Sequence, residues 1–349
     1  MSAGEGIEYS KRLGRISDEQ FAGATKRLGV GTFVKAAPAT SGLFGQNVFL
    51  TTSEGEFVLR GAPHWVDLSR EGPWKFERND LWQFSKEICF ANLLHEHTDA
   101  PVSWPQLLDR ESDIFGWPYI IMPRMPGTCF DERQLRKTIS PEQRQSAARA
   151  MGSMLVRLQK LAWPFAGDVD LSFKLVPYPG GHTAHVVRET AKFADNARKN
   201  GGLSAEDDAW IERIGEAARA VSVVRPNLYV HGDFKPGNLT LSTDGDEMTV
   251  TGIFDLHESR IGDGASDICR QACGYLDFDP EMTKEFVATY RSQAGDDPTI
   301  RDRMPLYVIN DRMKFWEYFT RPPDVAPWLK GKTFRDWAGR YVDEILDLL

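Results

Sequence analysis

Residues 231 to 255 read HGDFKPGNLTLSTDGDEMTVTGIFD and form the most informative segment of the chain. Apolar and β-branched residues predict strand-rich segments at Leu228–Leu241 and Met248–Leu256. Asp244-Gly245 is a turn signal between these two segments. The pattern therefore predicts a hairpin that carries polar side chains near its open end.

Three of those side chains suit phosphoryl transfer, which needs a carboxylate beside the attacking hydroxyl and ligands for a metal ion that neutralises phosphate charge. Asp233 can orient an acceptor hydroxyl and take its proton. Asn238 lies five residues on, across a Pro-Gly turn, and can aim its amide oxygen back into the same site. Asp255 supplies a second carboxylate, so Asn238 and Asp255 are predicted to hold Mg²⁺. The alternative for Asp233 and Asn238 is a turn-capping pair, which leaves the residues after Asp255 unexplained.

The segment is similar to the catalytic loop of protein kinases, H-R-D-L-x-x-x-N followed by D-F-G, but Gly232 follows the histidine and the D-F-G glycine is missing. In these respects it resembles the aminoglycoside phosphotransferase and choline kinase family. That family's second motif runs Asp, aromatic, several residues, then Gly-Asp-Pro and Asp-Leu. Here Leu256 replaces the aromatic residue and Gly264 the proline. The register of the motif is kept by Gly262, Asp263 and Asp267.

Neighbouring residues of the two motifs have expected roles of their own. We interpret Asp263 and Asp267 as structural residues that brace the catalytic loop through caps and hydrogen bonds. His231 is expected to be a packed scaffold residue rather than a catalytic one. Lys235, two residues after Asp233, is interpreted as a catalytic contact to the transferred phosphate, with a solvated lysine as the alternative.

The resemblance implies an α+β, protein-kinase-like bilobal fold. A small antiparallel β-rich N-terminal lobe is expected at residues 1–123, a hinge at 124–128 and a larger, mainly helical C-terminal lobe at 129–349. Three β-rich runs fit the first lobe, at Thr32–Ala37, Gln46–Thr51 and Glu56–Gly61. An amphipathic helix with apolar residues between Leu81 and Leu94 follows them. Ser140-Pro141-Glu142-Gln143 is a capping box that predicts a helix start in the second lobe.

The resemblance also implies a nucleotide site in the N-terminal lobe. Ser41 to Asn47 occupies the place of the nucleotide-covering loop, although it is not G-x-G-x-x-G and an ordinary hairpin loop is the alternative. Arg60 stands where most kinases carry a lysine that contacts phosphate, and Glu87 is its expected ion-pair partner. The backbone of Pro123–Met125 would receive the base. The expected nucleotide-binding residues are Ser41, Gly42, Asn47, Arg60, Glu87, Pro123, Arg124 and Met125.

Composition limits the partners. The 349 residues carry 42 Lys and Arg against 50 Asp and Glu, a formal net charge of −8, which disfavours nucleic acid. The first fifteen residues lack a secretory signal pattern, and stretches such as Tyr119–Pro123 are too short to cross a bilayer, so we expect a cytoplasmic protein without a membrane partner. Four cysteines indicate no disulfide framework, and Cys269 and Cys273 are expected to be small buried side chains.

The sequence therefore predicts a Mg²⁺-dependent kinase that uses ATP or GTP to phosphorylate a hydroxyl of a small molecule. The acceptor is expected to be an aminoglycoside-like antibiotic or another amino or sugar alcohol, bound mainly by the C-terminal helical region. The aromatic residues there would stack on it or form core. One alternative is a kinase-like nucleotide-binding protein without activity, which the Arg60 substitution favours. A protein kinase is disfavoured, because no A-P-E follows Asp255 and the segment to Asp267 is too short for an activation loop. The oligomeric state stays open.

Overall fold

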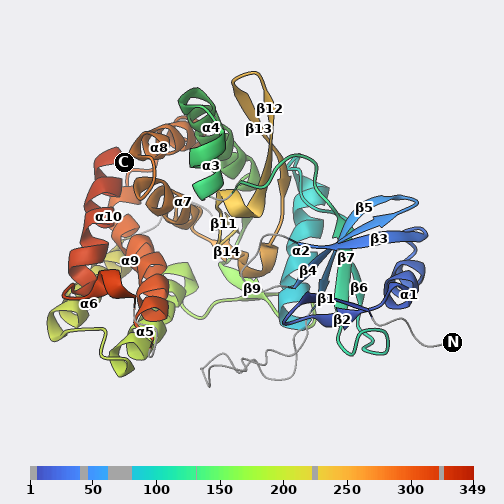
Figure 1. Cartoon of the computed structure of the whole chain (residues 1–349). Helices are drawn as coiled ribbons and strands as arrows, with labels where there is room; N and C mark the ends of the chain where they lie inside the picture. The colour runs from blue at the N-terminus through green and yellow to red at the C-terminus, as the bar shows by residue number, and fades with distance from the viewer. Residues whose placement is uncertain (1–5, 40–45, 62–80, 131, 222–226, 322–325) are drawn as a thin grey trace.

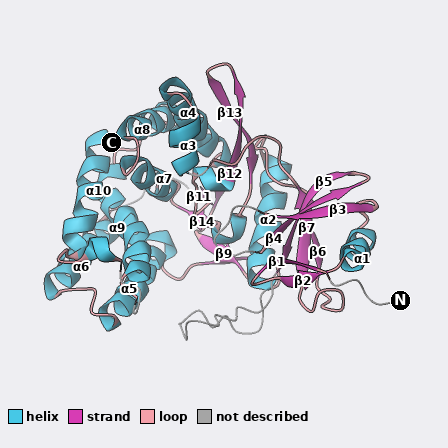
Figure 2. Cartoon of the chain, viewed as in Figure 1, coloured by secondary structure: helices cyan, strands magenta, loops and turns pink. Residues whose placement is uncertain are grey.

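The computed structural model describes residues 6–39, 46–61, 81–130, 132–221, 227–321 and 326–349. Figure 1 shows a β-rich lobe that contains the N-terminal elements and a larger helical lobe that contains the C-terminus. Most helices lie in the second lobe, and strands occur in both lobes (Figure 2). The predicted bilobal α+β fold is confirmed.

The N-terminal lobe is built on an antiparallel sheet with the strand order β3-β4-β5-β7-β6. Burial alternates along β4, so Val48, Leu50 and Thr52 point to the same face of the sheet, and Ser53-Glu54 makes the tight turn into β5. The predicted meander of three strands is confirmed. The strands are β3 (Phe33–Pro38), β4 (Asn47–Thr52), β5 (Gly55–Gly61), β6 (Leu107–Asp109) and β7 (Tyr119–Pro123).

Helix α2 (Leu81–His97) covers one face of this sheet, as its apolar spacing predicts. Phe84 and Ile88 pack against Ile120 and Met122 of β7. Lys86 reaches the other lobe, where its Nζ lies 2.9 Å from a carboxylate oxygen of Asp168. The helix therefore lies between the two lobes (Figure 1) and turns Glu87 towards the sheet.

The opposite face of the sheet is covered by elements that we did not predict: β1 (Ile7–Ser10), β2 (Gly14–Ile16) and α1 (Asp18–Leu28). Ser17 and Gln20 form a capping box at the start of α1, and Gly29 ends it in the left-handed conformation. Phe21 is fully buried in the resulting core. These elements cover the face of the sheet that points away from the C-terminal lobe (Figure 1).

The C-terminal lobe combines eight helices of the described residues with short strands. The helices are α3 (Glu132–Thr138), α4 (Pro141–Leu158), α5 (Gly181–Lys199), α6 (Ala205–Ala220), α7 (Ser266–Leu276), α8 (Pro280–Ala294), α9 (Ile300–Phe319) and α10 (Phe334–Leu348). The capping box at Ser140 and Gln143 is present as predicted. None of the helices described here is long and apolar enough to cross a membrane.

The strands of this lobe modify the predicted hairpin. β12 (Leu239–Asp244) and β13 (Glu247–Ile253) pair through the predicted turn. β11 (Asn227–Val230) instead pairs with β14 (Arg260–Gly262) and β8 (Ala162–Trp163). Strand β14 continues to β9 (Gly167–Val169) and β10 (Leu175–Pro177). The predicted segment 228–241 is therefore two strands in two sheets, separated by residues 231–238.

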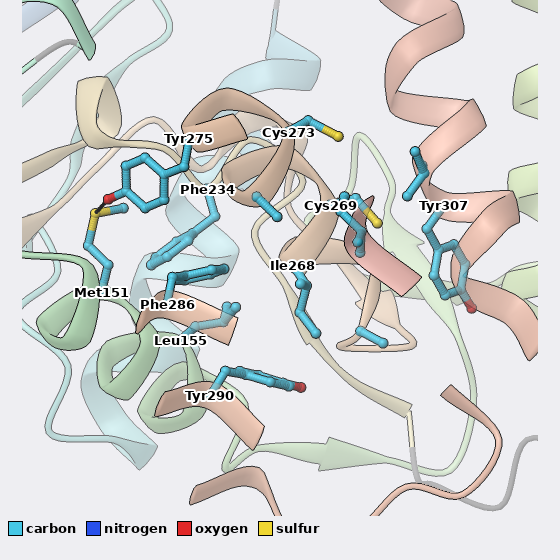
Figure 3. Packing of buried hydrophobic residues seen from close by; sticks show 14 of the residues in the cluster. Met151, Leu155, Phe234, Ile268, Cys269, Cys273, Tyr275, Phe286, Tyr290 and Tyr307 are labelled. Carbon is cyan, nitrogen blue, oxygen red and sulfur yellow. Dashed lines mark hydrogen bonds between the residues drawn. The ribbon is translucent and has the colours of Figure 1, made fainter. Parts of the chain in front are cut away.

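A large apolar core anchors those intervening residues. Phe234 is fully buried, and its ring stacks with that of Phe286 at a centroid distance of 6.5 Å. Figure 3 shows Phe234, Phe286 and Tyr275 close together, with Met151 beside Tyr275. Cys269 and Cys273 are fully buried, as predicted. Phe234 thus ties residues 231–238 to helix α8, which carries Phe286.

Candidate active site

The loop after β11 owes its shape to one glycine and one buried carboxylate. Gly232 has φ +78°, and a Cβ added to it would lie 2.4 Å from the carbonyl oxygen of Glu258, so only glycine fits. Asp267 accepts hydrogen bonds from the backbone N–H groups of His231 at 2.7 Å and Gly232 at 2.8 Å. The expected bracing by Asp267 is therefore present in the structure.

His231 is fully buried, in keeping with its expected scaffold position. Its ring lies edge-on to those of Tyr229 and Phe234. Asp263 is also held inside the protein, by the guanidinium of Arg303 and by the hydroxyl of Tyr307 at 2.7 Å. Both residues therefore support the loop from within.

Asp233 lies at the surface of the loop with its carboxylate fixed by three side chains. Lys235 Nζ donates to Oδ2 at 2.6 Å, and Asn238 Nδ2 donates to the same oxygen at 2.9 Å. Arg270 Nε donates to Oδ1 at 2.7 Å. Burial raises the pKa of Asp233, but the charges of Arg270 and Lys235 outweigh it, so the pKa falls below its usual range. The carboxylate is therefore ionised and oriented.

Arg270 is a site residue that our sequence reasoning missed. It lies on α7, three residues after Asp267, so the two side chains share one face of the helix. That spacing is a signal in the sequence, because Asp267 was already assigned to the catalytic loop. Its guanidinium also lies 4.6 Å from the ring centroid of Phe315 on α9, which fixes its direction.

A second cluster joins the N-terminal sheet to the residues after β13. Arg60 on β5 forms a buried ion pair with Glu87 of α2, as the sequence predicted. The same guanidinium lies 2.9 Å from Oδ1 of Asp255, and its Nε donates to Asn47 Oδ1 at 3.0 Å. Arg60 therefore brings together residues from β4, α2 and the other lobe.

Asp255 occupies an unusual backbone conformation, with φ +66°, and its carboxylate also meets His257 Nδ1 at 2.7 Å. Burial raises the pKa of Asp255, but His257 and Arg60 lower it well below its usual range. Conversely, burial lowers the pKa of His257, and Asp255 outweighs burial to raise it to about 9. His257 is a second residue that sequence reasoning did not single out.

Asn238 and Asp255 offer oxygen atoms of the kind that bind a hard divalent cation. The backbone carbonyl of Asn238 accepts from Phe254 N at 3.2 Å, so Asn238 lies next to the segment that carries Asp255. Carboxylate and amide oxygens are the ligands that Mg²⁺ prefers. Glu87, Asp255 and His257 also offer ligand atoms within 4.8 Å of one another, but Arg60 already occupies the space between Glu87 and Asp255. We therefore regard Asn238 and Asp255 as the better pair.

The remaining expected nucleotide residues lie where the lobes join. Ser103 Oγ donates to the carbonyl of Pro123 at 2.7 Å, and Arg124 N continues the sheet by donating to Glu56 O at 3.0 Å. The side chain of Arg124 is exposed and lies over the ring of Phe49. Met125 packs against Gly252 of β13. Ser41 and Gly42 lie outside the described residues.

The aromatic residues of the C-terminal region are mostly core. Trp316 and Trp337 are buried, and their ring centroids lie 5.7 Å apart. Trp328 is partly exposed and packs on Phe319 and Trp337. The structure thus favours the core alternative for Trp316 and Trp337.

Comparisons with known proteins agree with this geometry. A model of the "Phosphotransferase enzyme family" matches residues 35–307. A crystal structure of a candidate aminoglycoside phosphotransferase from Ralstonia eutropha JMP134 superposes with a TM-score of 0.61 at 14% identity, covering 96% of this chain and 97% of that one. A GDP and kanamycin complex of APH(2″)-IIIa has a TM-score of 0.59 at 14% identity, covering 93% and 95%. A type VIII aminoglycoside-3′-phosphotransferase has a TM-score of 0.51 at 19% identity, covering 85% and 98%. At these identities the likeness establishes a shared fold.

Proposed function

Because this chain belongs to the phosphotransferase enzyme family, we propose that it transfers the γ-phosphate of ATP or GTP to a hydroxyl of a small molecule, with Asp233 as catalytic base. The observation that carries the proposal is the fixed carboxylate of Asp233, held by hydrogen bonds from Lys235 and Asn238. Phosphoryl transfer depends mainly on such positioning and on charge stabilisation.

In this proposal Asp233 orients the acceptor hydroxyl. As the hydroxyl oxygen bonds to the γ-phosphorus, the bond from that phosphorus to the bridging oxygen breaks, the nucleoside diphosphate leaves, and the hydroxyl proton passes to Asp233. The low pKa of Asp233 suits a late proton transfer, because such a weak base chiefly orients the hydroxyl until the new bond has formed.

Lys235 is proposed to contact the transferred phosphate. In the present arrangement its ammonium is bound to Asp233 at 2.6 Å, so a phosphate group next to Asp233 would lie within its reach. Its positive charge would stabilise the negative charge that develops on the phosphate oxygens.

Nucleotide binding is proposed at the junction of residues 1–123 and 129–349, with 124–128 as the hinge. Arg60, aligned by Glu87 and Asn47, would contact the phosphates, and the backbone of Pro123–Met125 would receive the base. A bound Mg²⁺, held by Asn238 and Asp255, would supply charge neutralisation on the phosphates. Ser41 and Gly42 remain proposals from the sequence.

The test is a coupled nucleotide-consumption assay with Mg²⁺ and either ATP or GTP, run against aminoglycosides, other antibiotics, choline, sugars, amino alcohols and hydroxy acids. We expect one acceptor to give turnover that the Asp233→Ala variant lacks. If no acceptor gives Asp233-dependent turnover, the proposal is wrong and an inactive nucleotide-binding protein becomes the better account.

A further inference from the structure

A small cavity of about 20 Å³ lies directly beside the catalytic loop. Gly232 and Arg270 line it from the side of Asp233, and Arg260 and Lys314 line it from β14 and α9. A volume of this size admits a group of about one water molecule or slightly more. The cavity can therefore take a small polar end of an acceptor, but not a sugar ring.

The carboxylates around this cavity are already neutralised by cations of the chain. Asp233 binds Lys235 and Arg270, and Asp311 lies 2.5 Å from a guanidinium nitrogen of Arg312. A polycationic acceptor needs carboxylates that are free to pair with its ammonium groups. Neither of these two acids meets that condition.

The carboxylates just outside the cavity wall are also paired with cations of the chain. Glu258 lies 3.5 Å from Lys314, and Glu189 lies 3.6 Å from Arg260. Asp267, the remaining acid of the cavity wall, accepts hydrogen bonds at both carboxylate oxygens from the backbone N–H groups of His231 and Gly232. Each carboxylate that the described residues contribute to the cavity wall thus has an internal partner, whereas Oε2 of Glu189, outside the wall, accepts no hydrogen bond among the described residues.

Two of the cations, in contrast, are held loosely. The distances of 3.5 Å from Lys314 to Glu258 and 3.6 Å from Arg260 to Glu189 exceed those of close charged hydrogen bonds. Arg260 is only 8% exposed, and its Nε has no hydrogen-bond partner in the described part of the chain. A buried donor without a partner is costly, so an anionic group at this position would satisfy it.

The electrostatics of Lys314 agree with this geometry. Burial lowers its pKa, but Glu258 and Glu189 outweigh burial, with a further contribution from Asp233, and the pKa is raised. The ammonium group of Lys314 is therefore protonated. It lines the same cavity as Gly232 of the loop that carries Asp233.

We propose that the acceptor of this phosphotransferase carries a carboxylate, which Lys314 and Arg260 bind in this cavity while the acceptor hydroxyl lies at Asp233. The inference rests on the proposed function and narrows the acceptor from any small molecule with a hydroxyl group to hydroxy acids. Polycationic aminoglycosides are poor candidates in this account, because the internal ion pairs would have to break to bind them.

The test compares three acceptors of one carbon skeleton that differ in charge: D-glycerate, glycerol and 3-amino-1,2-propanediol. Their binding to the protein saturated with Mg²⁺ and a non-hydrolysable ATP analogue is measured by ligand-detected NMR titration. We expect D-glycerate to bind at least about ten-fold more tightly than the other two, since a charge-assisted contact contributes at least this much. The inference is overturned if the amine binds as tightly as the acid, or if none of the three binds.

Variants link the preference to the cavity. Lys314→Met should remove the preference for D-glycerate, whereas Lys314→Arg, which keeps the charge, should retain most of it. Lys284→Met, at an exposed lysine of α8, is the matched control and should change nothing. A preference that survives Lys314→Met in a folded protein would overturn the assignment. Asp233-dependent turnover of kanamycin, without binding of D-glycerate, would overturn this inference while leaving the proposed function intact.

Discussion

Arg270 of α7 donates a hydrogen bond from Nε to Oδ1 of Asp233 at 2.7 Å, on the side of the carboxylate opposite Lys235 and Asn238. The carboxylate is therefore held at both oxygens. This pair connects the catalytic loop to the helices behind it and sets both the direction and the ionisation of Asp233.

Arg270→Met should lower kcat about 10- to 100-fold, because Asp233 keeps its place in the loop but loses the contact that fixes its carboxylate. Nucleotide affinity should stay near the wild-type value, since the described contacts of Arg270 are with Asp233, Asp311 and Phe315. The measurement is steady-state kinetics together with a nucleotide titration. Arg149→Met, at an exposed arginine of α4, serves as control, and an unchanged kcat in Arg270→Met would refute the orienting role.

Arg60→Lys should weaken nucleotide binding about ten-fold, because a lysine cannot reach Glu87, Asp255 and Asn47 at once. Arg60→Met should in addition destabilise the fold by about 3–5 kcal/mol, since Glu87 would be left as a buried charge without its partner. Nucleotide titration and urea denaturation separate the two effects. Wild-type nucleotide affinity in Arg60→Lys would show that the guanidinium geometry is unimportant.

Gly232→Ala should destabilise the protein by more than about 2 kcal/mol and abolish turnover, because the new Cβ collides with the carbonyl of Glu258. Gly245→Ala is a matched control, since Gly245 also has positive φ but has nothing within 4 Å of an added Cβ. The control should cost only about 1 kcal/mol, from the backbone conformation alone. Equal losses in the two variants, measured by urea denaturation, would argue against the steric explanation.

Acidification should destabilise the fold through His182. Burial, together with the charge of Arg260, lowers its pKa from 6.5 to about 3, and neither ring nitrogen has a hydrogen-bond partner among the described residues. Between these two pKa values the unfolded chain binds more protons than the native one. The free energy of unfolding is therefore highest above the unfolded pKa and decreases as the pH falls below it. Between about pH 7.5 and about pH 5, His182 should lower the free energy of unfolding by about 2 kcal/mol.

The measurement for this prediction is urea denaturation at both pH values. His182→Leu should remove that part of the pH dependence, and His97→Leu, at an exposed position, should not. If His182→Leu loses as much stability on acidification as the wild type does, other groups control the acid sensitivity.

The sequence predicted those features that local patterns encode. The three-strand meander, α2 and the capping box at Ser140 follow from periodicity and turn residues, and all three are present. The pairing of Arg60 with Glu87 was predicted from the resemblance and is present. The Ser17 and Gln20 capping box of α1 was readable in the same way but was overlooked.

What could not be predicted are contacts between segments distant in the sequence. Arg270 is 37 residues from Asp233, and Lys314 is 56 residues from Glu258. The spacing of Arg270 from Asp267 on α7 hints at the first pair, but no local spacing indicates the second. The separation of β11 from the hairpin is of the same kind, because its partner β14 follows the hairpin in the chain. These long-range pairs decide the charge around the site, which neither the net charge nor the family resemblance specifies.

The most direct test of the central claim is the effect of Asp233→Ala on kcat and on nucleotide affinity, measured with the acceptor that gives turnover. We predict that kcat falls about 10²- to 10⁴-fold, as expected for loss of a general base, while the dissociation constant of the Mg²⁺-nucleotide complex changes less than about three-fold. Retention of wild-type kcat in a folded Asp233→Ala protein would contradict the account.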